Sequence, residues 1–116
     1  MNYWIQNLSP HGSPDEIGVI QLAWLGDSVW ELHQRLRHIH IPLKSRDLHL
    51  SVVNEVKAQA QSKSLDEIEH LLNSFEINLI RRARNKTKRF PKSSDPAIYS
   101  RATGFEALVG WLFLKD

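Results

Sequence analysis

Apolar residues recur every three or four positions along most of the chain, which is the spacing of one face of an amphipathic helix. The segment Ser13-Pro14-Asp15-Glu16 holds a capping hydroxyl, a proline at the first helical position and a glutamate three residues after the cap. This pattern is a capping box, and it predicts the start of a long helix that ends near Arg37. The residues expected on its buried face are Ile17, Ile20, Leu25, Val29, Leu32 and Leu36.

Two helices are predicted in the middle of the chain. Ser45 can cap the first of them, which extends toward Ser62. Its expected apolar positions are Leu48, Val52, Val53 and Val56. The segment Ser64-Leu65-Asp66-Glu67 is a second capping box and predicts that a new short helix begins there.

Two more helices are predicted toward the C-terminus. Ser74 can cap one with Ile77, Ile80 and Ala83 facing inward, and Asp95-Pro96 can start another that reaches about Leu114. The buried positions expected in the last helix are Phe105, Leu108, Val109 and Leu112. Because no segment alternates apolar and polar residues over the length of a strand, we expect an all-α fold. The expected organisation is an N-terminal extension over residues 1–13 and one domain over residues 14–116.

Composition limits the classes of function. A chain of 116 residues can bury one core, and its 41% apolar and 24% charged residues are typical of a globular protein. The chain has no cysteine, which excludes disulfides, thiolate zinc sites and thiol nucleophiles. The N-terminal residues do not form a signal peptide, and the apolar runs are too short to span a membrane, so we expect neither secretion nor a membrane anchor.

The net charge of +2 is small, but the positive charges are concentrated in one segment. No acidic residue occurs from Ile77 to Ser94, whereas seven of the chain's 15 lysines and arginines lie there. We call residues 81–92 the basic segment; its cations are Arg81, Arg82, Arg84, Lys86, Lys88, Arg89 and Lys92. Such clustering is typical of nucleic-acid binding, although a solvated helix end with cations near its C-terminus would give the same pattern.

Two acids lie within apolar sequence on separate predicted helices. Asp27 follows Leu-Ala-Trp-Leu-Gly, and Glu106 lies between Phe105 and Ala107. A buried carboxylate needs an ion pair, hydrogen bonds or a metal, so a shared metal site is one explanation for both acids. The alternative is that each acid pairs with a core arginine, such as Arg35 or Arg101.

These motifs together resemble the ribonuclease III family, and in particular its Mini-III branch. Residues 22–29, Leu-Ala-Trp-Leu-Gly-Asp-Ser-Val, are similar to the signature helix of ribonuclease III catalytic domains. Residues 82–86, Pro91-Lys92, Asp95, Tyr99 and residues 102–110 are similar in order and spacing to the corresponding block of Mini-III. The resemblance covers nearly the whole chain from about Glu16.

The resemblance implies an all-helical, two-fold homodimeric, metal-dependent endoribonuclease that cuts double-stranded RNA and leaves 5′-phosphate ends. It implies Asp27 and Glu106 as catalytic residues and ligands of Mg²⁺, for which Mn²⁺ can substitute. The larger ribonuclease III pattern carries a further acid in each motif, where this chain has Ala23 and Thr103. Waters, phosphate oxygens of the substrate or another acid would then complete the metal shell. Glu31 and Glu55 are the candidate acids, although a pair with Arg35 is the expected role of Glu31.

The resemblance also implies how the RNA is bound. Duplex RNA is recognised mainly through its phosphates, 2′-hydroxyls and shape, and no residues remain in this chain for a separate double-stranded-RNA-binding domain. The residues expected to bind RNA are Arg82, Arg84, Asn85, Lys86, Lys88 and Lys92. The implied substrate is the precursor of the large (23S) ribosomal RNA, with a ribosomal protein as a further partner, in the bacterial cytoplasm or the plastid stroma. The alternative function is that of a catalytically weak or inactive relative that binds structured or ribosomal RNA.

Overall fold

The computed structural model describes residues 8, 12–40, 54–90, 92 and 95–115. Within these ranges every regular element is a helix, which confirms the predicted all-α fold. The described residues form the short 3₁₀ turns η1 (Pro14–Glu16) and η2 (Glu69–Leu71). The α-helices in these ranges are α2 (Val19–His38), α4 (Asn54–Ile68), α5 (Ser74–Lys86) and α6 (Pro96–Lys115).

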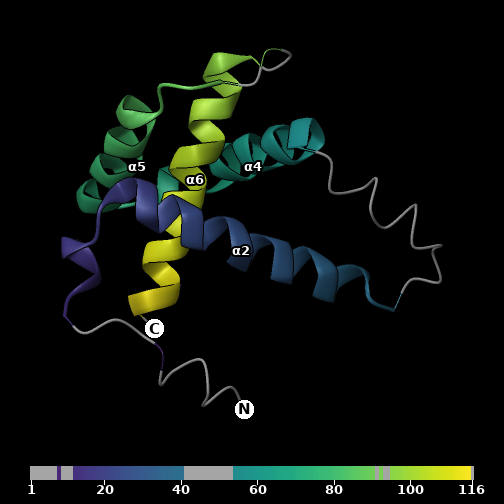
Figure 1. The fold of residues 1–116 in the computed structure, drawn as a ribbon, viewed down its shortest axis with the longest axis horizontal. Helices are drawn as coiled ribbons and strands as arrows, with labels where there is room; N and C mark the ends of the chain where they lie inside the picture. The colour runs from purple at the N-terminus through teal and green to yellow at the C-terminus, as the bar shows by residue number, and fades with distance from the viewer. Residues whose placement is uncertain (1–7, 9–11, 41–53, 91, 93–94, 116) are drawn as a thin grey trace.

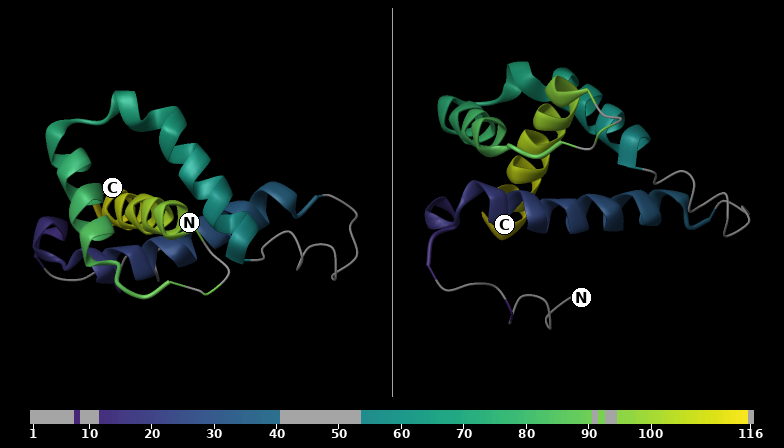
Figure 2. Two further views of the ribbon diagram at one scale, coloured as in Figure 1. Left: turned by 90° about the horizontal axis from the view of Figure 1, so that it is seen from above. Right: turned by 45° about the horizontal axis from the view of Figure 1, so that its top comes forward.

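The last helix, α6, lies at the centre of the fold (Figure 1). It packs against α2, α4 and α5, and the view from above shows α6 nearly end-on with these three helices around it (Figure 2). The core residues of α6 are Ala102, Phe105, Ala107, Leu108 and Trp111, which are buried against Leu22, Leu65, Leu79 and Ala83 of the surrounding helices. A central helix surrounded in this way must be apolar on most of its faces, as the sequence of α6 is.

The helices α2 and α6 cross with their backbones almost in contact. A Cβ atom added at Gly26 would lie 1.7 Å from the carbonyl oxygen of Glu106, and one at Gly110 would lie 2.1 Å from that of Leu22. Any side chain larger than hydrogen at either position would hold the helices apart. The two glycines therefore bring Asp27 and Glu106, each next to this crossing, close together.

The predicted first helix is wrong in its start and in its buried face. Ser13 does cap a turn, since its hydroxyl accepts a hydrogen bond from the amide of Asp15, but only the 3₁₀ turn η1 follows. Ile17 is extended, and α2 begins after Gly18. The buried residues of α2 are Val19, Leu22, Ala23 and Gly26, whereas Ile20, Leu32 and Leu36 of the predicted face are exposed. Gly26 lies at the close crossing with α6, on the same buried face as Val19 and Leu22, whereas Ile20, Leu32 and Leu36 lie on the solvent side.

Two predicted helix starts are also wrong. Ser64 lies inside α4, which continues to Ile68, so the capping box expected there does not begin a helix. The cap of α5 is Asn73 instead of Ser74, and Asn73 and Glu76 exchange the two hydrogen bonds of a capping box. The predicted cap at Ser45, with Leu48, Val52 and Val53, lies outside the described residues, as does the side chain of Val56.

The predicted bounds of α6 are confirmed, and so is the burial of Phe105 and Leu108, but Val109 is only partly buried and Leu112 is exposed. Its first turn is capped by Asp95, whose Oδ1 accepts a hydrogen bond from the amide of Ala97, and the helix ends one residue beyond the expected Leu114. Trp111 near its C-terminal end donates an indole hydrogen bond of 2.7 Å to Asp15, which ties η1 to the central helix. No helix within the described ranges combines the length and apolar content that crossing a bilayer requires.

Candidate active site

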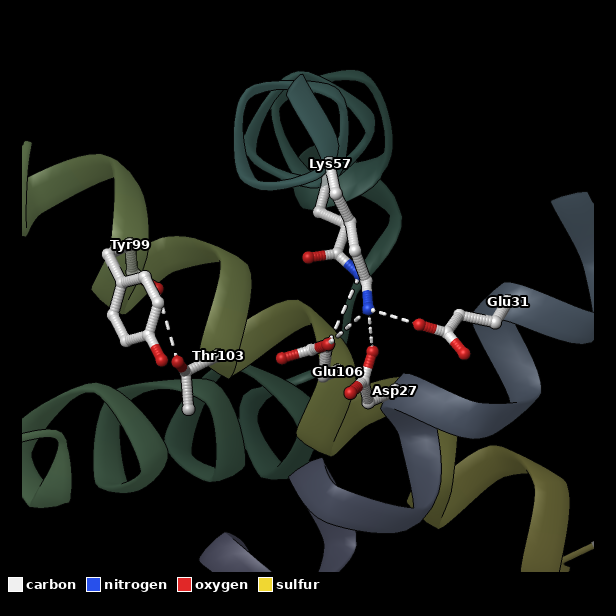
Figure 3. A network of polar contacts seen from close by, with 7 residues as sticks. Asp27, Glu31, Lys57, Tyr99, Thr103 and Glu106 are labelled. Carbon is white, nitrogen blue, oxygen red and sulfur yellow. Dashed lines mark hydrogen bonds and ion pairs between the residues drawn. The ribbon is translucent and has the colours of Figure 1, made fainter. Parts of the chain in front are cut away.

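Asp27 and Glu106 lie together beside the crossing of α2 and α6, as the sequence predicts (Figure 3). Asp27 follows Gly26 on α2, and Glu106 is the residue on α6 whose carbonyl lies against Gly26. The Asp27 side chain is 43% exposed and that of Glu106 is 16% exposed. The pair is thus open to solvent on the Asp27 side and largely enclosed on the Glu106 side.

A lysine from α4 lies between the carboxylates. The ammonium group of Lys57 forms an ion pair with Asp27, lies 3.1 Å from Oε1 of Glu31 and 4.0 Å from Oε2 of Glu106 (Figure 3). The Lys57 side chain is only 10% exposed. We call Asp27, Glu31, Lys57 and Glu106 the carboxylate cluster.

A glutamine one helical turn after Lys57 also reaches the cluster. Gln61 is 1% exposed, and its side-chain amide donates a hydrogen bond of 3.3 Å to Oε2 of Glu106. Since a buried amide needs a partner, this bond satisfies Gln61 and fixes the orientation of the carboxylate. Lys57 and Gln61 thus supply positive charge and a donor from the same face of α4.

Burial shifts the pKa values of two members of the cluster. Desolvation raises the pKa of Glu106 above its ordinary value, with Glu31 adding to the rise, while the Gln61 hydrogen bond and Lys57 oppose it. Desolvation also lowers the pKa of Lys57, against the attraction of Glu106. Both shifts show that charge is costly at this position, and that each charged group there depends on its neighbours.

The expected arginine partners of these acids are wrong. Arg101 pairs with Asp66 at 2.5 Å and with Glu69 at 3.3 Å, away from the cluster. Glu31 pairs with Lys57 and not with Arg35. The side chain of Glu55, the other candidate ligand, lies outside the described residues.

The carboxylate oxygens of the cluster are suitable ligands for a divalent metal, although they surround a lysine in this structure. Among the described side chains, no group of three histidines or acids is close enough together to hold an ion. Three carboxylates nevertheless point toward one cationic centre, the ammonium of Lys57, and carboxylate oxygens are the ligands that Mg²⁺ prefers. The residues therefore fit a metal in chemistry, and binding would require the lysine to move.

Two further positions near the cluster carry no acid. Ala23 is 5% exposed and packs in the core. The hydroxyl of Thr103 donates a hydrogen bond of 3.1 Å to the carbonyl of Tyr99 on the same helix (Figure 3). Neither residue can supply a carboxylate ligand.

The basic segment begins on α5 and continues beyond its end at Lys86. Of the residues predicted to bind RNA, five are exposed: Arg82, Asn85, Lys86, Lys88 and Lys92. Arg84 differs, because it is half-buried and its Nε donates a hydrogen bond of 3.5 Å to the hydroxyl of Ser100 on α6.

A surface pocket of about 360 Å³ joins the basic segment to α6. Lys86, Lys88 and Arg89 line it on one side, and Tyr99 and Thr103 line it from α6. Thr103 precedes Glu106 by about one helical turn. The cations are therefore close to the helix that carries Glu106, which the linear sequence could not show.

Sequence reasoning missed Lys57 and Gln61. Their spacing of four residues places them on one face of a helix, but many exposed polar residues have the same spacing. The sequence signal for a cation here was indirect: two acids within apolar sequence need a compensating positive charge. The arginines considered for that role do not provide it in the structure.

The ribonuclease III domain family matches residues 20–116 of the chain. A Mini-ribonuclease 3 of Gloeobacter violaceus is 45% identical over 95 residues, which cover 82% of this chain and 70% of that protein. A Mini-ribonuclease 3 of a Synechococcus species is 37% identical over 111 residues, which cover 96% of this chain and 80% of that protein. The fold is similar to the crystal structure of a Fusobacterium nucleatum protein, with a TM-score of 0.77 and 31% identity over 86% of this chain and 81% of that one.

Proposed function

The chain belongs to the ribonuclease III family, and on this premise we propose that it is a metal-dependent endonuclease that cuts double-stranded RNA. The observation that carries the proposal is the convergence of Asp27 and Glu106 from two helices on one charged centre. The Mini-ribonuclease 3 relatives support the same activity by their name.

Asp27 and Glu106 would hold Mg²⁺, or Mn²⁺ in its place, with Glu31 as a third carboxylate. A bound divalent ion supplies an activated water and offsets charge on the scissile phosphate, so that hydrolysis leaves a 3′-hydroxyl and a 5′-phosphate. Gln61 holds the Glu106 carboxylate in one orientation from a buried position. The partial exposure of Asp27 leaves that side of the cluster accessible to a phosphate from solvent.

The basic segment would bind the RNA backbone. Lys86, Lys88 and Arg89 are exposed beside a pocket whose other wall is α6, so a strand bound there passes near the helix that carries Glu106. Binding through phosphates suits a duplex, whose base edges are poorly accessible in the deep major groove. Arg82, Asn85 and Lys92 would extend this surface, while Arg84 supports it from its contact with Ser100.

A homodimer is part of the proposal. Four apolar residues lie along the solvent side of α2, at Ile20, Trp24, Leu32 and Leu36, and their exposure ranges from 46% to 80%. Large exposed apolar patches of this kind are typical of protein interfaces. A two-fold dimer through this face would bury them and give the assembly two catalytic clusters, one for each strand.

Cleavage of a long perfect RNA duplex in Mg²⁺, followed on a denaturing gel, tests the activity. We expect discrete products from the wild type and none in EDTA. Asp27→Asn should lower the rate at least about 100-fold, because a metal ion contributes several kcal/mol to stabilising the transition state. Asp66→Asn is the matched control, since Asp66 is an exposed acid outside the cluster, and it should cleave as the wild type does.

The result that opposes the proposal is tight duplex binding with no metal-dependent cleavage. That outcome would favour the catalytically weak or inactive RNA-binding relative.

If the enzyme is active, we propose the precursor of the large ribosomal RNA as its natural substrate, in the cytoplasm of a bacterium or the stroma of a plastid. A ribosomal protein would then be a further partner, and precursor RNA with and without ribosomal proteins is the substrate to compare.

A further inference from the structure

We propose that Lys57 is the internal counter-ion of the candidate metal site. Its ammonium group holds Asp27, Glu31 and Glu106 together in the metal-free protein and competes with the divalent cation for them. This inference rests on the proposed function, because it concerns the same carboxylates. It assigns Lys57 a positioning role that is separate from contact with RNA.

The geometry places one cation against carboxylates of two helices. The ammonium of Lys57 is paired with Asp27 and Glu31 of α2 and lies 4.0 Å from Glu106 of α6. Lys57 itself comes from α4, so a single charge joins three helices at the point where the acids meet. Without it, the three acids would repel one another beside the close crossing of α2 and α6.

The surroundings of Lys57 differ from those of an ordinary surface lysine. Its side chain is 10% exposed, whereas Lys63 on the same helix is exposed and has no ion pair among the described residues. No other lysine or arginine within the described ranges pairs with Asp27, Glu31 or Glu106. Within that part of the chain, Lys57 is the cation that compensates these carboxylates.

A divalent ion and the ammonium cannot both take this position. The same oxygens that face Lys57 are those that would bind the ion, and two positive charges in contact repel each other strongly. The lysine stem has four flexible carbons, which allow the ammonium to withdraw while the backbone of α4 stays in place. Metal binding therefore requires the ion pairs of Lys57 to break.

The first experiment measures Mn²⁺ binding to the full chain by the electron paramagnetic resonance signal of the free ion. Lys57→Gln removes the competing charge, and we expect it to bind Mn²⁺ on the order of tenfold more tightly than the wild type, which is about 1.4 kcal/mol. Lys63→Gln makes the same change at the exposed lysine and should leave the affinity unchanged. In EDTA, Lys57→Gln should unfold at a lower temperature than the wild type and regain more stability from Mn²⁺.

A lysine that only stabilises the fold would give a different pattern. Equal or weaker Mn²⁺ binding by Lys57→Gln would overturn the inference while leaving the proposed function intact, provided that the wild type binds Mn²⁺. If neither protein binds Mn²⁺, the metal site itself fails, and with it both proposals.

A second measurement needs no variant and covers the case in which Lys57→Gln does not fold. Acetylation of wild-type lysines by an amine-reactive ester, followed by mass spectrometry, reports how accessible each ammonium is. Lys57 should react slowly in EDTA and faster as Mn²⁺ is added, while Lys63 reacts equally in both. Unchanged protection of Lys57 at saturating Mn²⁺ would show that the ion does not displace it.

Discussion

The close crossing of α2 and α6 makes Gly26→Ala the sharpest structural test. The added methyl group would lie 1.7 Å from the carbonyl oxygen of Glu106, 2.6 Å from the carbonyl carbon and 2.9 Å from the amide nitrogen of Gly110. All three atoms belong to the backbone, so no change of side-chain conformation can make room. The two helices must separate, and the separation occurs beside Asp27 and Glu106.

The cost can be estimated from two opposing effects. Overpacking a core costs about 1–3 kcal/mol and occasionally more, and a backbone clash lies at the upper end of that range. Alanine offsets about 1 kcal/mol of it through its higher helix propensity. We expect a net loss of about 2 kcal/mol in the free energy of unfolding and a melting temperature lower by about 8 °C.

The effect on catalysis should exceed the effect on stability. Ordinary contact requires the helices to move apart by on the order of 1.5 Å, and a misplacement of about 1 Å can cost 100-fold in rate. Activity should therefore fall about 100-fold in protein that circular dichroism shows to be folded. The loss should appear in the turnover of saturating duplex RNA more than in its binding.

The other glycines provide a graded set of controls. Gly110→Ala meets the Leu22 carbonyl at 2.1 Å and should resemble Gly26→Ala, whereas Gly104→Ala meets the movable Ile80 side chain at 2.7 Å and should be milder. Gly18→Ala meets only the end of the Gln21 side chain at 3.2 Å and should cost less than about 1 kcal/mol as a change of cap. Thermal unfolding and cleavage assays on the four variants give the ranking. A Gly26→Ala protein as stable and active as Gly18→Ala would refute the close crossing.

Three further predictions concern pH, salt and assembly. Because burial raises the pKa of Glu106, the folded metal-free protein binds the proton of this carboxyl more tightly than the unfolded chain does. The free energy of unfolding should therefore fall as pH rises from the ordinary carboxyl range through the raised pKa. Urea titrations at several pH values should show this slope, and Glu106→Gln should remove it. Alanine at Arg82, Lys86 and Lys88 should weaken duplex binding and reduce the slope of log affinity against log salt by about 2 to 3, measured by filter binding, and an unchanged slope would move the RNA surface elsewhere. Trp24→Glu should yield a folded monomer in sedimentation equilibrium, since this side chain is 80% exposed, and a dimer that persists would exclude this face as the interface.

The sequence predicted α6 well because several signals agree there. Asp95 and Pro96 mark its start, and a long apolar segment follows without a break. The sequence predicted α2 less well because both of its faces carry apolar residues. Leu32 and Leu36 fit the apolar repeat but are exposed, while the buried face carries Val19 and Leu22 and approaches α6 most closely at Gly26.

The site was predictable in its acids and not in its cation. Asp27 and Glu106 stand out because each is a charge within apolar sequence, and burial of a charge is costly. Lys57 carries no such signal, since its neighbours on α4 are largely polar and its burial arises only when α4 packs against α6. Tertiary packing decides which cation pairs with a given acid, and this pairing cannot be predicted from residue spacing along one helix.

The charge balance of the carboxylate cluster follows from the residues that it lacks. Ala23 is buried among apolar residues, and the Thr103 hydroxyl is satisfied by its own helix, so neither position adds a negative charge. Three carboxylates and one ammonium then leave a formal charge of −2 when all are ionised. When the ammonium withdraws for metal binding, the three ionised carboxylates carry −3, so one divalent ion leaves a charge of −1 and a second would leave +1 before RNA arrives. Further acids at positions 23 and 103 would bring the cluster to five carboxylates, which a single lysine would offset less completely than it offsets three.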